Sequence, residues 1–166
     1  MTRTAVYPGT FDPITKGHLD ILKRGLTMFD SIVVAVAIDT PKTTLFTVDE
    51  RLRLVKSVTR RMPGVRVSPL SGLLVSFAKN QKAVAILRGL REVSDFEYEF
   101  QMALMNRRLS PKLETVFLMP SENYTFLNSS IIRQISQLGG NISEFVPTVV
   151  EKALKKKYLI QQRNFD

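Results

Sequence analysis

Residues 4–18 read TAVYPGTFDPITKGH, and in this order they predict a buried strand, a sharp loop and the start of a helix. The first four residues are small, β-branched or aromatic, as in a strand, and Pro8 and Gly9 are expected to end it. From His18 onward an apolar stripe recurs at helical spacing, formed by Leu19, Leu22, Leu26 and Phe29. His18 therefore lies in a first helical turn, where unpaired backbone N–H groups and the helix dipole favour an anion.

Two interpretations of His18 are open at this point. Strand–turn–helix units with a glycine are common in α/β proteins, and a lone histidine often only satisfies its own turn. Here, however, Thr10, Lys16 and the only histidine of the chain crowd into one short loop and helix start. Gly17 in addition has no Cβ that would keep a phosphate at a distance. The crowding favours a phosphate-binding site.

The composition predicts one compact domain that spans residues 1–166. The chain is 44% hydrophobic, which is enough for one sizeable core. A C-terminal helix is expected at about residues 146–159, followed by a frayed tail. The lack of cysteine excludes disulfides and thiolate metal sites. No apolar run reaches the length of a membrane span and no secretory pattern opens the chain, so a cytoplasmic protein is expected.

The net charge of +9 predicts an anionic partner, which could be nucleic acid, a membrane surface or a phosphorylated small molecule. The lysines of residues 152–157 are interpreted as a solvated helix face. Four other cations follow predicted strands or lie in the first loop, namely Lys16, Lys42, Arg88 and Arg91. Their placement favours a small phosphorylated ligand.

Five apolar segments alternate with helical ones along the chain. Strands are expected at residues 4–7, 32–38, 65–67, 83–87 and 115–119, and helices near 18–29, 47–60, 73–79, 94–109, 129–139 and 146–159. This alternation predicts an α/β fold with a doubly wound, Rossmann-like, five-stranded parallel sheet of order 3-2-1-4-5 and helices on both faces. Strands 1 and 4 are then neighbours, and the loops at residues 10–18 and 88–91 should border a ligand crevice.

Several helices carry more specific expectations. A Thr47–Glu50 capping box should open the second helix and turn Leu52 and Val55 inward. In the third helix Leu74 and Phe77 should face inward. The helix at 94–109 has two apolar stripes, Phe96, Phe100 and Leu104 on one side and Tyr98, Met102, Met105 and Leu109 on the other. One sheet face can bury only one stripe, so the second is expected to meet another subunit.

The chemistry implied by these residues is not covalent catalysis. The sequence shows no nucleophile–base pair, no clustered metal ligands and no Walker loop with its lysine and serine. What the predicted crevice collects is a set of hydrogen-bond donors and cations. Such a set suits phosphoryl or nucleotidyl transfer, in which positioning and charge stabilisation do most of the work.

Residues 7–18, YPGTFDPITKGH, resemble the (T/H)xGH signature of the nucleotidylyltransferase superfamily, in the form typical of the phosphopantetheine adenylyltransferase family. The segments RGLR at 88–91, DFEYE at 95–99, FLMP at 117–120 and NSS at 128–130 resemble that family in order and spacing. The resemblance covers almost the whole chain. It implies transfer of an adenylyl group from ATP to 4′-phosphopantetheine, giving dephospho-coenzyme A and pyrophosphate by direct in-line attack. It further implies a homohexamer, and Mg²⁺ held mainly by the ATP phosphates with no metal site of the protein's own.

The resemblance also implies roles for individual residues. The catalytic residues would be His18, Lys42, Arg91 and Thr10. The ATP site would comprise Thr10, Phe11, His18, Gly89, Leu90, Arg91, Glu99, Tyr124, Thr125, Phe126, Leu127, Asn128, Ser129 and Ser130. The phosphopantetheine site would comprise Thr10, Lys42, Leu73, Leu74, Arg88, Met105 and Asn106. Asn128 departs from the family, which usually has a serine there, and asparagine can still donate and cap. Without the resemblance, Ser129 and Ser130 would be interpreted as helix caps.

Two other functions remain as alternatives. One is a basic nucleic-acid-binding protein, which the charge permits, although most aromatic residues fall on inward stripes and not on an exposed stacking surface. The other is an adenylyltransferase or cytidylyltransferase with a different phosphorylated acceptor. We expect neither nucleic acid nor a membrane as a partner.

Overall fold

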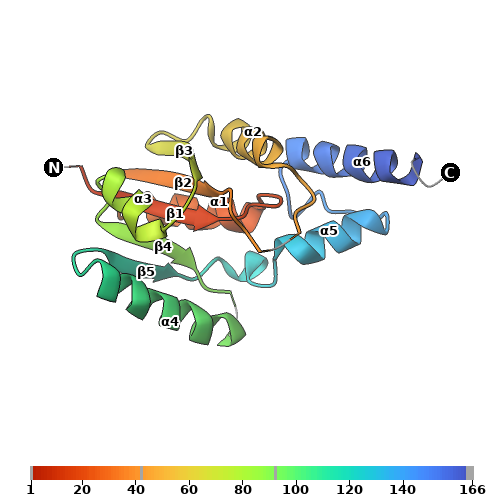
Figure 1. Ribbon diagram of the computed structural model, residues 1–166. Helices are drawn as coiled ribbons and strands as arrows, with labels where there is room; N and C mark the ends of the chain where they lie inside the picture. Colours follow the sequence, from red (N-terminus) through yellow and green to blue (C-terminus); the bar gives the residue numbers. More distant parts are fainter. Residues whose placement is uncertain (1, 42, 92, 164–166) are drawn as a thin grey trace.

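The computed structural model describes residues 2–41, 43–91 and 93–163, and only the backbone of residues 93–95 and 160–163. Its centre is a parallel sheet in the order β3-β2-β1-β4-β5, which confirms the predicted fold (Figure 1). The strands are β1 (Thr4–Gly9), β2 (Ser31–Ala37), β3 (Val65–Leu70), β4 (Ala85–Gly89) and β5 (Glu114–Leu118). The helices are α1 (Lys16–Gly25), α2 (Val48–Thr59), α3 (Leu74–Asn80), α4 (Val93–Leu109), α5 (Ser129–Gln137) and α6 (Thr148–Arg163), with a short 3₁₀ turn, η1 (Glu122–Tyr124).

The sheet separates two apolar clusters, because successive residues of a strand point to opposite faces. Ala5 and Tyr7 face the larger cluster, which receives buried side chains from α1, α2, α5 and α6. Val6 faces the smaller cluster, to which α3 contributes. In Figure 1, α5 and α6 lie beyond one end of the sheet, with α6 alongside α2, while α4 runs along β5. Both faces of the central strand are thereby covered, as expected of a doubly wound sheet.

The prediction that Pro8 and Gly9 end the first strand is wrong, because β1 runs through both residues. Both pair with β2, whereas the pairing of β1 with β4 is confined to Ala5 and Val6. The Pro8 carbonyl accepts a hydrogen bond from Arg88 on the β4 side. The missing N–H of the proline therefore lies where the ladder to β4 has already stopped, so it costs no strand hydrogen bond.

The other strands also differ from their predicted bounds. β3 continues through Pro69 to Leu70, which is permitted because β3 is an edge strand. β4 ends at Gly89, two residues beyond the predicted end at Leu87. Arg88 and Gly89 therefore belong to the strand itself, which gives them a fixed backbone instead of a loop.

Inward positions on α2 and α3 were predicted only in part. The Thr47–Glu50 capping box is present, and Val55 is fully buried. Arg51, however, occupies the inward position expected of Leu52, which is only half-buried. On α3 the buried residues are Val75 and Ala78. Leu74 and Phe77 lie at the margin of the same cluster.

The C-terminal helix, predicted at about residues 146–159, spans Thr148–Arg163. Val150 and Leu154 of this helix are fully buried. A frayed tail was expected after residue 159, but the backbone of residues 160–163 is helical. No glycine or proline interrupts the helix at this end of the chain. The last three residues of the predicted tail lie outside the described part.

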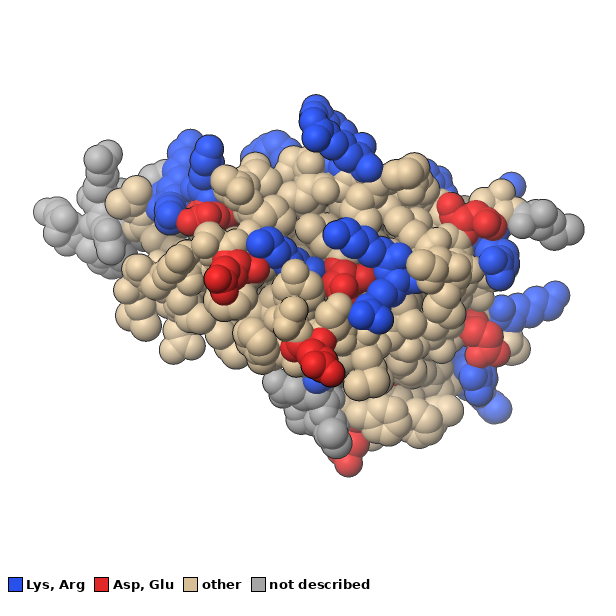
Figure 2. Space-filling view, turned by 180° about the vertical axis from the view of Figure 1, so that it is seen from behind, with Lys and Arg blue, Asp and Glu red and all other residues tan. Residues whose placement is uncertain are grey.

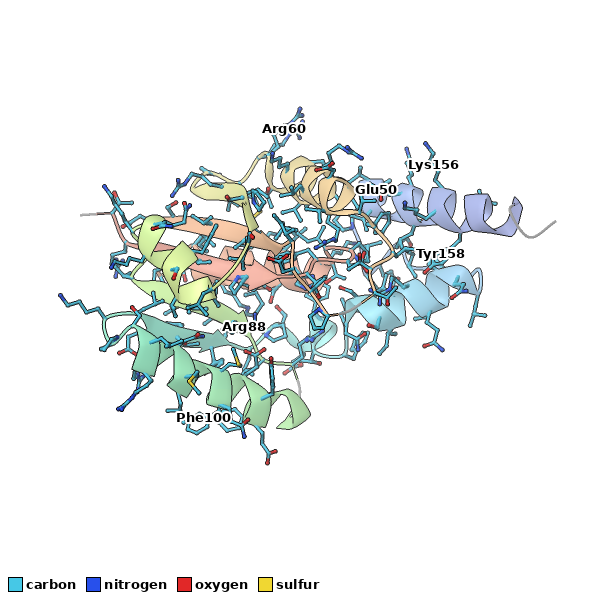
Figure 3. All side chains as sticks on the ribbon, in the orientation of Figure 1. Glu50, Arg60, Arg88, Phe100, Lys156 and Tyr158 are labelled. Carbon is cyan, nitrogen blue, oxygen red and sulfur yellow. The ribbon has the colours of Figure 1, made fainter. Side chains whose placement is uncertain are left out.

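The prediction that the sheet buries one apolar stripe of α4 is wrong. Seven apolar side chains of this helix are between 38% and 65% exposed, and they come from both stripes: Phe96, Tyr98, Phe100, Met102, Leu104, Met105 and Leu109. The inward line consists instead of Glu99, Ala103 and Asn106. The helix is turned this way because Glu99 pairs with Arg88 at the end of β4. In Figure 3, Phe100 points away from the sheet.

Candidate active site

Three separate segments of the chain meet beyond the carboxyl ends of β1 and β4. Arg88 Nη1 donates to the Pro8 carbonyl at 3.0 Å, which joins β4 to the end of β1. Arg91 Nη1 donates to the Leu127 carbonyl at 3.0 Å, which joins the loop after β4 to residues 124–130. A Cβ added to Gly17 would lie 3.6 Å from Tyr124 Cβ, so the start of α1 borders the same segment. The predicted convergence of the loops at 10–18 and 88–91 is therefore present, and residues 124–130 lie beside both loops.

The segment around residue 121 is tied to α1 by one carboxylate. Asp20 accepts hydrogen bonds from the Ser121 backbone N–H and hydroxyl, both at 2.8 Å. Although burial raises the pKa of Asp20, these bonds and the Arg24 guanidinium outweigh it, so the net pKa is lowered. Asp20 therefore stays charged and fixes residues 121–130 against α1.

His18 completes a capping box at the start of α1. Its backbone N–H donates to Thr15 Oγ1 at 3.4 Å. Its ring Nδ1 in turn accepts the Thr15 backbone N–H at 3.0 Å. The ring also contacts the Phe11 ring edge-on, with centroids 5.1 Å apart. Because Nδ1 is an acceptor, the proton of the neutral ring lies on Nε2, which is left to donate to a ligand.

The electrostatic surroundings keep this ring uncharged. Burial first, and then the charges of Arg91 and Arg88, lower the pKa of His18 from 6.5 to about 3. At neutral pH His18 is therefore a neutral N–H donor and not a cation. The structural and the functional interpretation of His18 are therefore compatible. Nδ1 takes part in the helix cap, and Nε2 is the hydrogen-bond donor for a ligand.

The neutral state of His18 predicts a direct spectroscopic result. As this is the only histidine of the chain, its ring signals can be assigned without mutagenesis. We expect the Nε2–H form to persist between about pH 5 and 8, where a free imidazole would titrate. Proton–nitrogen correlation spectra of the ring through a pH series measure this, and a ring that titrates near pH 6.5 would contradict the assignment.

The same shift has a consequence for stability. Below pH 6.5 the unfolded chain takes up a proton that the folded chain does not bind until about pH 3. The buried neutral ring of His18 therefore leaves the free energy of unfolding unaffected above pH 6.5. Below that pH it lowers the free energy of unfolding, and the loss grows as the pH falls. By about pH 5 the loss should be on the order of 1–2 kcal/mol of unfolding free energy, relative to His18→Gln measured in parallel. A constant difference between the two proteins across this range would oppose the prediction.

Arg88 and Glu99 form a partly buried ion pair between the end of β4 and α4. Arg88 Nε donates to Glu99 Oε2 at 2.7 Å, and Nη2 donates to Glu99 Oε1. The side chains are 28% and 13% exposed. Burial lowers the pKa of Arg88, but the hydrogen bonds and charge of Glu99 outweigh it and the net pKa is raised. The pair holds a permanent cation, with its guanidinium oriented, at the strand end.

The start of α5 differs from the interpretation of its serines as caps. Asn128 is the N-cap, and its side-chain oxygen accepts the Ile131 N–H at 2.7 Å. The Ser129 hydroxyl instead donates to the Pro13 carbonyl at 2.8 Å. The Ser130 hydroxyl accepts a bond from Arg133 at 3.3 Å. Asparagine at the usual serine position therefore has a capping role, because a cap requires a short side-chain oxygen.

The remaining predicted residues lie at different depths. Thr10 is half-buried, and Leu90 follows β4 with its N–H bonded to the Leu118 carbonyl at 3.0 Å. Within the predicted phosphopantetheine site, Leu73 and Met105 are more than half exposed and Leu74 is half-buried. Asn106 is buried. Lys42 lies outside the described residues.

Sequence reasoning missed a buried polar network beneath the site. Asp12 and Arg51 are 3% and 1% exposed, and Arg133 of α5 forms an ion pair with Asp12. Of these residues, only the burial of Arg51 could have been predicted from the sequence, because Arg51 lies one helical turn before Val55 on the inward side of α2. Nothing in the pattern around Asp12 distinguishes a buried carboxylate from a loop residue.

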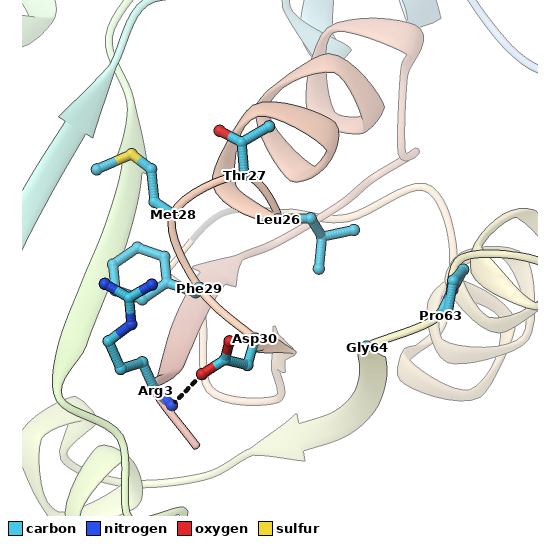
Figure 4. A pocket seen from close by; sticks show the side chains of 8 residues that line it. All are labelled: Arg3, Leu26, Thr27, Met28, Phe29, Asp30, Pro63 and Gly64. Carbon is cyan, nitrogen blue, oxygen red and sulfur yellow. Dashed lines mark hydrogen bonds between the residues drawn. The ribbon is translucent and has the colours of Figure 1, made fainter. Parts of the chain in front are cut away.

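Two further hollows lie away from these loops. One is at the opposite edge of the sheet, before β1, β2 and β3, where Arg3, Pro63 and Gly64 line it with residues 26–30 (Figure 4). The other lies between α2 and α6, with Phe46 at its floor and basic residues at its rim. Neither contains a residue of the predicted site, so the candidate active site is the convergence of loops described above.

The described residues show neither a metal-binding cluster nor a membrane-spanning helix. No group of three or more His, Asp or Glu side chains among them could hold a metal ion. In the same described part, no helix is long and apolar enough to cross a bilayer. On the face drawn in Figure 2, acidic side chains lie among the basic ones, so the positive excess forms no continuous basic surface there.

Known proteins resemble this chain in sequence and in fold. The cytidylyltransferase-like family model matches residues 6–135. The chain is 60% identical over 156 residues to the phosphopantetheine adenylyltransferase of Moorella thermoacetica, covering 94% of this chain and 98% of that protein. It is 54% identical over 159 residues to the phosphopantetheine adenylyltransferase of Thermodesulfovibrio yellowstonii, covering 95% and 99%.

Two solved structures share the fold at low identity. A bifunctional NMN adenylyltransferase/ADP ribose pyrophosphatase from Francisella tularensis matches with a TM-score of 0.66 and 17% identity, over 99% of this chain and 54% of that one. A lipopolysaccharide core biosynthesis protein from Thermoplasma volcanium matches with a TM-score of 0.58 and 22% identity, over 74% and 100%. Together with the sequence relatives, this fold and this convergence of loops show that the chain belongs to the cytidylyltransferase-like family and, by its relatives, to the phosphopantetheine adenylyltransferases.

Proposed function

We propose that this enzyme transfers the adenylyl group of ATP to 4′-phosphopantetheine. An oxygen of the acceptor phosphate attacks the α-phosphorus of ATP, the bond from that phosphorus to the bridging oxygen breaks, and pyrophosphate leaves. Dephospho-coenzyme A is the other product. The observation that carries the proposal is the meeting of Arg88, Arg91 and the neutral His18 donor beyond the ends of β1 and β4, together with the full-length relatives of this name.

Each part of the site has a task in this reaction. Arg88 and Lys42 hold the acceptor phosphate, and Thr10 contacts phosphates of both substrates. Arg91 and the Gly17 N–H at the start of α1 hold the triphosphate; the neighbouring Lys16 and His18 N–H groups donate to the Phe145 carbonyl and to Thr15 Oγ1. Residues 124–130, with Gly89, Leu90 and Glu99, shape the nucleotide site. Donors fixed in this way need no reorganisation when charge develops at the α-phosphorus, and this is the main source of catalysis in phosphoryl transfer.

Magnesium fits the site only as a companion of ATP. The described residues supply no cluster of carboxylates for it, and Mg²⁺ commonly binds through substrate phosphates with several waters. When bound there, it neutralises charge on the triphosphate. The chain's own cations and N–H groups orient the phosphates that carry the ion.

The test is a panel of acceptors with ATP, monitored by release of pyrophosphate. We expect 4′-phosphopantetheine to be adenylylated and nicotinate mononucleotide to be inert. Activity with nicotinate mononucleotide but not with phosphopantetheine would replace the proposed acceptor while keeping the adenylyl transfer. Tight, saturable binding of nucleic acid at physiological salt in a filter assay would instead favour the nucleic-acid-binding alternative.

We further propose that the enzyme works in the cytoplasm as a homo-oligomer, a hexamer by family resemblance. Support comes from α4, whose apolar residues are exposed on both stripes. A helix that is apolar around most of its circumference is ordinarily buried. The sheet covers only the side of α4 that carries Ala103 and Asn106. We therefore propose that a second copy of the chain covers the exposed apolar side chains of this helix.

Light scattering during size-exclusion chromatography at micromolar concentration tests the assembly. We expect a mass well above the 18.8 kDa of one chain, and a shift toward that value in Phe100→Glu, which places a charge on the exposed face of α4. Met28→Glu is the control, since Met28 is similarly exposed at 40% but lies outside α4. A clean monomer for the unmodified protein would refute the proposal, and an unchanged mass for Phe100→Glu would move the interface elsewhere.

A further inference from the structure

Arg51 is a fully buried charge in a place where an apolar side chain would be expected. It heads the fully buried side chains by volume and is 1% exposed. Burial lowers the pKa of Arg51, against the opposing charge of Asp12. No ion pair of Arg51 is found among the described side chains. A buried guanidinium without a paired carboxylate is costly, and apolar residues of similar volume commonly replace buried ions without loss of stability.

The hydrogen bonds of Arg51 show what the guanidinium holds. Nη1 donates to the Thr10 and Ala37 carbonyls, both at 2.8 Å, and Nε donates to the Phe46 carbonyl at 3.3 Å. Ala37 ends β2, and Phe46 immediately precedes the Thr47 cap of α2. The side chain therefore joins both ends of the intervening segment, residues 38–46, to the loop that carries Thr10.

Asp12 repeats the same connection from the other side. Its carboxylate accepts the Leu45 and Phe46 N–H groups, each at 2.9 Å. Arg133 Nη1 donates to the same carboxylate at 3.1 Å and also to the Asp12 carbonyl. The network thus links the loop after β1, the end of the 38–46 segment and α5 through the buried side chains of Arg51 and Asp12 and the partly exposed side chain of Arg133.

We propose that Arg51, supported by Asp12, is a positioning residue that sets the separation between the 38–46 segment and Thr10. The inference rests on the proposed function, which assigns Lys42 of this segment to the acceptor phosphate and Thr10 to the reacting phosphates. The donors of a planar guanidinium are spread over fixed positions and so hold three separate carbonyls at set distances, whereas the three donors of a lysine ammonium radiate from one atom. The geometry of the acceptor half of the site depends on this fork, whereas Arg91 joins the loop after β4 to residues 124–130 through a separate hydrogen bond to the Leu127 carbonyl.

The test is a separation of the two substrates in steady-state kinetics. In Arg51→Lys and Arg51→Met, kcat/KM for phosphopantetheine should fall by about 10²-fold, the scale of a misplacement of roughly 1 Å. The KM for ATP should change far less. Calorimetric titration of each substrate gives the same separation as dissociation constants. Asp12→Asn keeps the shape of the side chain but loses one acceptor, and it should shift the same parameter in the same direction.

Leu54→Ala is the matched control. Leu54 is 8% exposed on the same helix, and its apolar side chain contributes no hydrogen bond to the network. Its truncation leaves a cavity and lowers the melting temperature, while both KM values should stay at the level of the unmodified enzyme. If the Arg51 variants likewise lose only melting temperature, Arg51 is purely structural and the inference is overturned. If Arg51→Met does not fold, the same kinetic comparison with Arg51→Lys and Asp12→Asn tests the inference.

This outcome is distinguishable from failure of the proposed function. If the unmodified enzyme adenylylates another phosphorylated acceptor and not phosphopantetheine, the assigned acceptor is wrong. The same kinetic separation, measured with the true acceptor, would still support the positioning role. Equal loss of both substrates in all three variants would contradict it whichever acceptor is used.

Discussion

Replacing His18 by alanine is expected to lower kcat by about 10²–10³-fold, which is the typical loss when one preorganised donor to a developing charge is removed. The neutral ring presents an Nε2–H group beside the loops that we propose hold the phosphates. The affinity for ATP should change much less, because Thr10, Arg91 and the Gly17 N–H at the start of α1 remain. Steady-state kinetics and ATP titration on the purified variant measure both effects.

The same substitution should also destabilise the protein, since His18 Nδ1 accepts the Thr15 N–H in the capping box. Loss of a capping interaction costs about 0.5–2 kcal/mol. Glutamine at this position is the appropriate control, because Gln is an ordinary partner of threonine in a capping box.

The two variants together separate the roles of the two ring nitrogens. His18→Gln should regain most of the melting temperature that His18→Ala loses, yet keep the low kcat. A destabilised His18→Ala with nearly full activity would end the catalytic assignment. Full activity in His18→Gln would show that only the cap matters.

Replacing Arg88 by alanine is expected to produce the second largest effect, on the acceptor. Truncating one member of a hydrogen-bonded, partly buried charge pair costs about 2–5 kcal/mol, or roughly 30-fold to several thousand-fold in affinity. We expect this loss in kcat/KM for phosphopantetheine, with a smaller change for ATP. The same direction is expected for Lys42→Ala. Loss of ATP affinity with unchanged acceptor affinity in both variants would reverse the assignment.

The ion pair complicates the interpretation of Arg88→Ala, and a double variant resolves it. Without Arg88, the Glu99 carboxylate is left only 13% exposed and unpaired, close to where a phosphate would bind. In Arg88→Ala/Glu99→Gln this negative charge is absent. Recovery of acceptor use in the double variant would attribute the loss to repulsion by Glu99. A persistent loss would attribute it to the missing guanidinium contact.

The fold was predictable because apolar patterning acts over whole elements. The uninterrupted run at β2 and the helical stripe after His18 each report which faces are covered, and their alternation leaves few topologies. Element ends were less predictable. Pro8 is compatible with a strand only where the ladder on its N–H side has stopped, and that depends on the neighbour β4, which local sequence does not specify.

The site was predictable where it coincides with strand ends and helix starts. His18, Arg88 and Arg91 could be placed because the topology brings their loops together. The double role of His18 and the pairing of Arg88 with Glu99 could not, since both depend on side-chain orientation across elements. The burial of Arg51 and Asp12 was not predicted, because a charged residue is ordinarily assigned to the surface unless a partner is known.

The orientation of α4 has a consequence for how the enzyme behaves on dilution. The helix carries Glu99 on its inner line and the proposed subunit contact on its outer side, so the carboxylate that orients Arg88 is fixed only as firmly as the helix itself. When subunits separate, mass action removes the stabilisation that association supplied. Specific activity should therefore decline at low enzyme concentration, first in the use of the acceptor, and initial rates should rise more steeply than in proportion to the amount of enzyme.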